Sequence, residues 1–328
     1  EMKTARTFLR WATCGSEGTW TIDEGNDYPR LAWESTPGIV LDFRLSDLLS
    51  GNGTEEDPYL IYTAHDIETI ASFPCEQDKR FRLMFVEGQG TRGSPYLLTT
   101  ADQFDMIGML QGEGDKHYKL AADIDLSGFD GKDGRPAFHM ISSFKGTFDG
   151  DGHAISHLTI TGGNNLGLFG SLEWGAEVRD LAVVDVNISG ASCAGALAGR
   201  NGGSLIRCAS AGSVHGDSYV GGLTGDNSAT MTECDNTAEV DSSGDFVGGL
   251  VGKNTGTVTQ CRNAGLVHSS GYNGYVGGLV GHNLSGAVTG CCSTSPVAGR
   301  RFVGGLIGYN YCGAMTHCYN TGAISAND

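Results

Sequence analysis

From about residue 167 to its end, the chain alternates short apolar runs with glycine and asparagine at a nearly constant interval. The run Gly-Leu-Phe-Gly, or a close variant of it, recurs along this stretch. Its leucines are Leu168, Leu197, Leu223, Leu250, Leu279 and Leu306, which lie 29, 26, 27, 29 and 27 residues apart. A nearly fixed period of this length is typical of a solenoid, in which each repeat forms one turn of a stacked array. We therefore expect the last five of these leucines, from Leu197 to Leu306, to form one inward-facing row.

Each repeat contains only short β-type runs. In one period these runs start at Tyr275, Gly286 and Pro296, and none is long enough for an amphipathic helix. Two or three short strands with their corners account for the period of about 27 residues per coil. Strands of successive coils pair in parallel, with like residues above like. Because parallel crossovers are almost always right-handed, the sequence predicts an all-β fold, a right-handed parallel β-helix.

Two polar rows recur with the same period. From the second run onward, an asparagine lies two residues after each closing glycine. We expect an amide ladder at one corner, formed by Asn201, Asn227, Asn254, Asn283 and Asn310. Cysteines follow at Cys208, Cys234, Cys261, Cys291 and Cys318. These cysteines fit either a disulfide framework or a ladder of free, buried thiols. Side chains stacked in register point the same way, which favours the free thiols.

The repeated Gly-Gly-Leu-Val-Gly-x-Asn, followed by Cys-x-Asn-x-Gly-x-Val, resembles the GLUG motif. That motif is found in large secreted and surface proteins of bacteria, including the non-catalytic part of some immunoglobulin A peptidases. The likeness begins at about residue 51 and covers most of the chain. It implies a β-helical protein that is extracellular or at the bacterial cell surface. Architecture unites this family, so the resemblance implies no particular biochemical activity.

Four segments are expected along the chain. Residues 1–34 resemble the segment that closes a GLUG module, so we expect them to belong to a preceding module or subunit. A connector at 35–50, a capping region at 51–120 and the β-helix at 121–328 follow. The closing segment is expected to pack on the last coil, 303–324, of a preceding copy. The result would be a head-to-tail homo-oligomer or filament, or tandem modules of one polypeptide.

The capping region contains an internal duplication. Residues 51–83 align with 88–120 without a gap at an offset of 37, and 13 of the 33 positions are identical. Each copy predicts a short strand and then a short amphipathic helix, with Thr63 or Thr100 as its N-cap. We expect these elements to cover the N-terminal end of the β-helix, where an open sheet edge would otherwise promote aggregation.

The charge and the hydropathy of the chain argue against two classes of partner, nucleic acid and membranes. The net charge of −17 disfavours binding to nucleic acid or to an anionic membrane surface. No apolar run approaches the length of about 18–20 residues that a membrane-spanning helix needs. Glycine makes up 52 of the 328 residues but proline only 7, which indicates turn-dense structure and not a disordered linker.

Several patterns imitate functional motifs. Residues 88–93 fit the glycine fingerprint of dinucleotide-binding proteins, but a strand and not a helix is expected after them, so no cofactor is predicted. His153 and His157 have the spacing of two zinc ligands on a helix, yet in a strand they would lie about 13 Å apart. Residues 123–128 begin like a calcium loop, but Gly134 stands where a bidentate glutamate is required.

Asp149 and Asp151 are the most serious candidates for chemistry. They could flank a Ca²⁺ ion or act as an acid/base pair, as carboxylates do in sugar-cleaving enzymes. The alternative is that Asp-Gly pairs are turn residues, and we favour it. We therefore predict no catalytic, cofactor-binding or metal-binding residue and no enzymatic activity.

Three classes of function remain. The first, which we favour, is a structural or adhesive surface protein that forms a rigid stalk or fibre segment. The second is a module that binds a host glycan or protein, for which the aromatic row Tyr219, Phe246, Tyr275 and Phe302 is the candidate surface if it faces outward. The third is a carbohydrate-active enzyme, which is disfavoured because Lys and Arg are sparse in the coils.

Overall fold

The computed structural model describes most of the chain after residue 43 and three short strands before it. The described residues are 20–22, 30–31, 39–40, 44–61, 64–73, 76, 78–83, 87–109, 113–272 and 274–326. The chain folds as two compact units, Glu1–Phe85 and Val86–Asp328. None of the described helices is long and apolar enough to cross a membrane.

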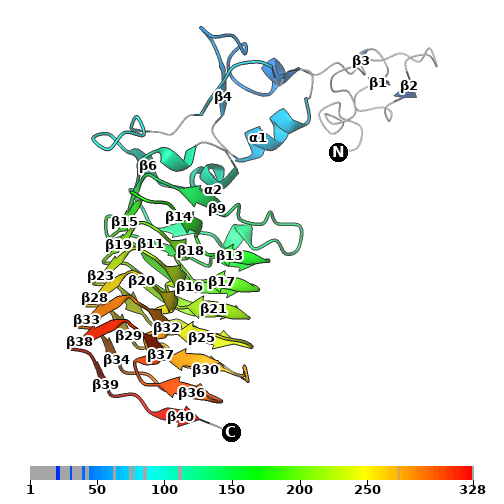
Figure 1. Cartoon of the computed structure of the whole chain (residues 1–328). Coiled ribbons are helices and arrows are strands. Elements are labelled where there is room, and N and C mark those ends of the chain that lie inside the picture. The colour runs from blue at the N-terminus through cyan, green and yellow to red at the C-terminus, as the bar shows by residue number, and fades with distance from the viewer. Residues whose placement is uncertain are drawn as a thin grey trace. The chain divides into compact units, whose positions relative to one another are not determined.

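The larger unit is a parallel β-solenoid whose strands stack into four sheets (Figure 1). The nine-stranded sheet contains β6 (Tyr96–Leu98), β7 (Tyr118–Leu120), β10 (Thr147–Asp149), β15 (Glu177–Arg179), β19 (Ser204–Ile206), β23 (Thr230–Thr232), β28 (Thr257–Thr259), β33 (Ala287–Thr289) and β38 (Ala314–Thr316). The seven-stranded sheet contains β9 (Ile141–Phe144), β14 (Phe169–Leu172), β18 (Ala198–Asn201), β22 (Thr224–Asn227), β27 (Val251–Asn254), β32 (Val280–Leu284) and β37 (Ile307–Tyr311).

The other two sheets complete each coil. The six-stranded sheet contains β13 (Asn164–Leu166), β17 (Ser192–Ala194), β21 (Ser218–Gly221), β26 (Val247–Gly248), β31 (Tyr275–Gly277) and β36 (Phe302–Gly304). The 13-stranded sheet contains β8 (Ile124–Asp125), β11 (Ala154–Ser156), β12 (Thr159–Thr161), β16 (Ala182–Ser189), β20 (Ala209–Gly216), β24 (Asp235–Asn236), β25 (Glu239–Ser242), β29 (Arg262–Asn263), β30 (Val267–Ser269), β34 (Cys292–Ser293), β35 (Val297–Gly299), β39 (Tyr319–Asn320) and β40 (Ile324–Ala326).

The register places like residues above like, as the repeat predicts. In the nine-stranded sheet Leu205 pairs with Met231, Met231 with Val258, and Val258 with Val288. The leucine row faces the core: the first five leucines, Leu168 to Leu279, are fully buried, and Leu306 in the last coil is half-buried. The predicted parallel β-helix and its inward leucine row are confirmed.

The asparagine row forms the predicted amide ladder. Each Nδ2 donates to the Oδ1 of the next asparagine, at 2.7 Å from Asn201 to Asn227 and 2.7 Å from Asn227 to Asn254. The ladder continues at 2.9 Å to Asn283 and 2.8 Å to Asn310. A second ladder was not predicted: Ser210, Asn236, Asn263 and Ser295 are bonded in series in the 13-stranded sheet.

All of the described cysteines are free, so the cysteine row consists of thiols. Cys208, Cys234, Cys261 and Cys291 are buried, and Cys318 in the last coil is half-buried. The backbone N–H groups of Cys234, Cys261 and Cys291 each donate to the thiol of the next coil, at 3.4 Å, 3.3 Å and 3.4 Å. The cysteines of the inner coils therefore act as small core residues, and the thiols of Cys261, Cys291 and Cys318 also accept a hydrogen bond.

The second copy of the duplication packs at the start of the solenoid. Strand β6 pairs with β7, and Phe104 of α2 (Ala101–Met109) stacks on Phe138, with ring centroids 5.3 Å apart. Thr100 is the helix N-cap: its hydroxyl accepts from the Gln103 N–H, and Gln103 Oε1 accepts from the Thr100 N–H. The 3-10 helices η5 (Glu113–Asp115) and η6 (Ser127–Phe129) follow.

The first copy lies in the smaller unit and has the same strand, helix and strand order. Strand β4 (Tyr59–Ile61) pairs in parallel with β5 (Phe81–Leu83), and α1 (Ala64–Ala71) lies between them in sequence. The buried Glu76 accepts from the Leu45 N–H of η3 (Leu45–Asp47) at 3.1 Å and from the Tyr59 hydroxyl at 3.0 Å. The predicted N-cap Thr63 lies outside the described residues.

Of residues 1–34, the structure describes only β1 (Trp20–Ile22) and β2 (Arg30–Leu31). These strands form an antiparallel sheet with β3 (Ile39–Val40). The rest of the predicted closing segment lies outside the described residues. Its packing on the coil at 303–324 of another copy therefore stays a prediction.

Candidate functional site

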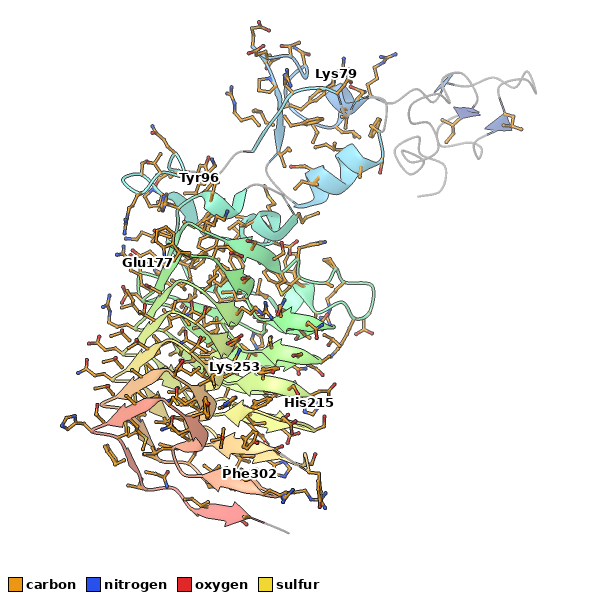
Figure 2. All side chains as sticks on the ribbon, viewed as in Figure 1. Lys79, Tyr96, Glu177, His215, Lys253 and Phe302 are labelled. Atoms are coloured by element: carbon orange, nitrogen blue, oxygen red, sulfur yellow. The ribbon has the colours of Figure 1, made fainter. Side chains whose placement is uncertain are left out.

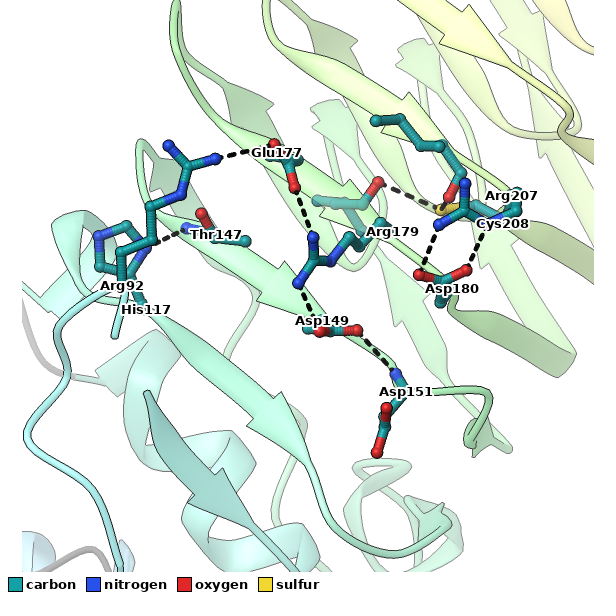
Figure 3. Close-up of polar contacts among 12 residues, drawn as sticks. Arg92, His117, Thr147, Asp149, Asp151, Glu177, Arg179, Asp180, Arg207 and Cys208 are labelled. Atoms are coloured by element: carbon teal, nitrogen blue, oxygen red, sulfur yellow. Dashed lines mark hydrogen bonds and ion pairs between the residues drawn. The ribbon is translucent and has the colours of Figure 1, made fainter. Parts of the chain in front are cut away.

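An open cleft of about 570 Å³ lies where the nine-stranded sheet turns toward the 13-stranded sheet. It contains both carboxylates that the sequence singled out, Asp149 and Asp151 (Figure 3). It is lined by Asp149, Asp151, Gly152, Arg179, Asp180, Leu181, Ala182, Arg207 and Ala209. Arg179 and Arg207 could not be predicted from the repeat, because arginine does not recur at their positions.

Parallel pairing brings Arg179 beside Asp149. Strand β15 follows β10 in the sheet, and Asp149 and Arg179 are register partners. Arg179 Nη2 lies 2.7 Å from Asp149 Oδ2, and its Nη1 lies 3.3 Å from Glu177 Oε1. These carboxylates, with the Asp149 hydrogen bond as the main cause, raise the pKa of the Arg179 guanidinium. Asp149 Oδ1 accepts from the Asp151 N–H at 3.0 Å, so both of its oxygens are bonded.

The other charged groups of the cleft are paired in the same way. Arg207 bonds both oxygens of Asp180, with Nε 2.6 Å from Oδ1 and Nη2 2.8 Å from Oδ2. This hydrogen bonding lowers the pKa of Asp180 and raises that of Arg207. Lys119 Nζ lies 2.9 Å from Asp151 Oδ2. These two pairs, like the pair of Arg179 with Asp149, each join one coil to the next.

This pairing limits the chemistry that the cleft can perform. A Ca²⁺ ion binds to carboxylate oxygens that are free to coordinate it. Here arginine, lysine or a backbone N–H already occupies both oxygens of Asp149 and one oxygen of Asp151. Among the described residues, no three His, Cys, Asp or Glu side chains converge as metal ligands would. The cleft therefore fits a set of ion pairs between coils.

His153 and His157, which have the spacing of two zinc ligands on a helix, contact two different aspartates. His153 Nδ1 lies 3.0 Å from Asp123 Oδ1, and His157 Nδ1 lies 2.9 Å from Asp125 Oδ1. Backbone hydrogen bonds are the main cause that lowers the pKa of both aspartates, from the Ala154 N–H to Asp123 and from the Ser127 N–H to Asp125. Residues 123–128, which begin like a calcium loop, therefore use Asp123 and Asp125 to contact histidines of another coil.

The aromatic row faces outward at the corner between the six-stranded and seven-stranded sheets. Tyr219, Phe246 and Tyr275 are half-buried, and Phe302 is 42% exposed. Strands of the seven-stranded sheet add His282 and Tyr309 beside them. We call these six residues the aromatic strip. Figure 2 labels Phe302, which belongs to the strip, and Lys253. The Nζ of Lys253 lies 5.9 Å from the centroid of the Tyr219 ring.

The rings of the aromatic strip cover one another's faces. Tyr219 and Phe246 stack with centroids 4.8 Å apart and an angle of 14° between planes, and Phe246 and Tyr275 stack at 5.4 Å and 29°. His282 stacks on Phe246 at 5.1 Å. A sugar ring that stacks on an aromatic side chain needs an open ring face, but neighbouring rings cover faces of Tyr219, Phe246 and Tyr275. The geometry of the strip fits a stabilising ladder on the outer surface.

Gly252, which closes a Gly-Leu-x-Gly run, allows two strands to pack closely at this corner. A Cβ added to Gly252 would lie 2.5 Å from the carbonyl carbon of Tyr219 and 2.6 Å from the Val220 nitrogen. Only glycine lets β27 approach the backbone of β21 so closely. The equivalent glycines Gly225 and Gly281 make the same close approach to the backbone of Cys193 and of Phe246.

His282 is expected to make stability pH-dependent. Burial, with a smaller contribution from Lys253, lowers the pKa of His282 below its usual value of 6.5. The folded state then binds fewer protons than the unfolded state. The stability that neutral His282 contributes is therefore fully present above about pH 6.5, its unfolded value, and is lost as the pH falls from there through the lowered pKa of the folded state. His282→Phe keeps a ring in the strip and removes the titration.

Urea unfolding of both proteins between pH 7.5 and 5 measures this effect. The free energy of unfolding of the wild type is expected to fall relative to that of the variant as the pH is lowered. Parallel pH profiles would contradict the assignment to His282.

No protein-family model matches the sequence. Over 204 residues, 61% of this chain, it is 33% identical to halomucin of Haloquadratum walsbyi, and it spans 2% of the length of that protein. The fold is similar to the crystal structure of a Bacteroides ovatus protein provisionally identified as an immunoglobulin A1 protease. That similarity has a TM-score of 0.60 at 21% identity and covers 72% of this chain and 78% of the other. At this identity, the likeness shows that the two chains share a parallel β-solenoid fold.

Proposed function

We propose that this chain is a rigid, non-enzymatic β-helical segment of a large GLUG-type protein at the cell surface or outside the cell. Its role would be structural or adhesive. The observation that supports this proposal best is the continuous bonding from coil to coil. The five-asparagine ladder, with links of 2.7–2.9 Å, runs through the same coils as the thiol row and the aromatic strip. Such an array resists bending because each coil is bonded to its neighbours on several sides.

The comparison with halomucin supports the proposal that this chain is one segment of a large protein. Halomucin is a much longer protein of which this chain matches 2%. A module that matches so small a part of a long relative fits a segment whose task is to extend or present other parts. The resemblance of the repeats to the GLUG motif points to the same class of secreted and surface proteins.

The charged cleft supports the non-enzymatic part of the proposal. An acid/base pair needs one carboxyl group that holds a proton and one that is free to accept it. Asp149 is bonded to Arg179 and Asp151 to Lys119, so neither carboxylate is placed to act on a substrate without first losing its cation. These ion pairs instead link coils of the solenoid.

Asp149→Asn tests this assignment. The variant is expected to unfold with a free energy lower by about 1 kcal/mol, because a partly exposed ion pair is lost. Neither the wild type nor the variant is expected to release reducing ends from polysaccharides or new termini from proteins. Asp185→Asn, the same change at an exposed position of β16, is the matched control. Reproducible turnover by the wild type that Asp149→Asn abolishes and Asp185→Asn retains would overturn the proposal.

A further inference from the structure

A second cavity, of about 370 Å³, lies on the 13-stranded sheet beside β30 and β35. Its size is within the range of small-molecule sites, roughly 300–1,000 Å³. It is lined by His268, Ser269, Ser270, Ala298, Gly299 and Arg300. Strand β35 pairs with β30 on one side and β40 on the other, so the cavity lies along the side of the stacked coils.

The charge of this cavity differs from that of the rest of the chain. None of the described residues that line it is acidic, although the chain has a net charge of −17. Arg300 is exposed and makes no ion pair with any carboxylate among the described residues, whereas Arg179 and Arg207 are both paired. An unpaired arginine on a cavity wall is a ready binding group for a carboxylate or sulfate, because its planar guanidinium matches two oxygens at once.

An exposed tyrosine stands beside this arginine. Tyr272 is 67% exposed, and the guanidinium carbon of Arg300 lies 5.8 Å from its ring centroid. Arg301 lies at 5.6 Å from the same centroid. The cationic groups are therefore held near an apolar surface that remains open to solvent, an arrangement suited to a ligand with both an anionic group and a ring.

His268 is a second polar side chain on the cavity wall. Its Nδ1 lies 2.6 Å from Asp241 Oδ1, and the other oxygen of Asp241 lies 3.0 Å from His215 Nδ1. Because Asp241 engages Nδ1, the nitrogen that His268 can offer to a ligand is Nε2. The hydroxyl of Ser270, which donates to Ser242 O at 3.4 Å, can still accept a hydrogen bond.

We propose that this cavity binds a saccharide with a single carboxylate or sulfate. Arg300 binds the oxyanion, His268 and Ser270 bond the sugar hydroxyls, and Tyr272 lies against the ring. The net charge of −17 opposes a densely charged polymer, so a ligand with one anionic group in the cavity fits better than nucleic acid. This site is separate from the structural role proposed above, and either proposal can fail without the other.

Calorimetric titration of the full chain with 3′-sialyllactose tests the proposal, with lactose as the neutral probe and sodium sulfate as the free anion. The wild type is expected to bind sialyllactose more tightly than either of the other two, and less tightly as salt is added. Arg300→Gln is expected to lower the affinity for sialyllactose about tenfold or more, the effect of losing a hydrogen-bonded charge pair. The variant is expected to melt like the wild type, because Arg300 is exposed.

Arg262→Gln is the matched control, since it removes the same exposed charge from β29 of the same sheet, outside the cavity. It is expected to bind sialyllactose as the wild type does. Equal losses in both variants would show a general charge effect and overturn the site. Equal affinity for lactose would remove the role of the anion, and equal affinity for sulfate would remove the role of the sugar. Absence of sialyllactose binding to the folded wild type would also overturn the proposal.

Discussion

Replacing Leu250 by aspartate is expected to lower the free energy of unfolding by about 4–5 kcal/mol, or to prevent the coils from forming. Leu250 is completely buried, and the leucines of the two adjacent coils, Leu223 and Leu279, are completely buried too. The substitution removes most of a packed side chain and places an unpaired carboxylate in an apolar core. Water cannot reach the charge, because the strands around it pair with both neighbouring coils.

Urea denaturation followed by circular dichroism measures this effect. Thr257→Asp is the matched control, since it adds the same charge at an exposed position of β28. The control is expected to change the free energy of unfolding by about 1 kcal/mol or less. If Leu250→Asp were as mild as the control, the inward direction of the leucine row would be wrong.

The stacked rows could be predicted from the sequence because of the geometry of in-register parallel pairing. Each position of one coil lies above the same position of the next, so a residue type that stacks well recurs at the coil period. Leu250, Asn254 and Cys261 each belong to such a row. Their common period is enough to predict the β-helix, and the aliphatic side chain of leucine predicts that its row faces inward.

Period alone could not give the direction or the packing of the aromatic row. Tyr275 recurs with the same spacing as Leu279, although one faces outward and the other inward. The stacking of ring on ring also involves His282 and Tyr309, which occupy a position where the preceding coils have Asp226 and Lys253.

The charged contacts were missed for a different reason. Asp149 and Arg179 lie 30 residues apart, and Asp241 meets histidines 26 and 27 residues away. These residues lie on the variable outer positions of the coils, where each pair occurs once. The repeat period predicts which residues lie beside them only when the register between successive coils is known. For the same reason, Arg300 and Tyr272 had no signal in the repeat itself.

Replacing Asn254 by alanine is expected to lower the free energy of unfolding by about 2–4 kcal/mol, because several buried partners lose their hydrogen bonds at once. Asn254 is fully buried in the middle of the amide ladder. Its Oδ1 accepts from Asn227 Nδ2 at 2.7 Å and from the Gly256 N–H at 3.2 Å. Its Nδ2 donates to Asn283 Oδ1 at 2.9 Å and to the Gly256 carbonyl at 3.2 Å.

The same substitution at the far end of the ladder is the control. Asn310 is exposed and makes equivalent contacts, with Asn283 at 2.8 Å and the Gly313 carbonyl at 2.9 Å. There, water can replace the lost partner, so Asn310→Ala is expected to cost less than about 1 kcal/mol. Urea unfolding of the two variants compares the buried and exposed links directly. Equal losses would mean that burial does not set the strength of the ladder, and a small loss in both would mean that the amides do not hold the coils together.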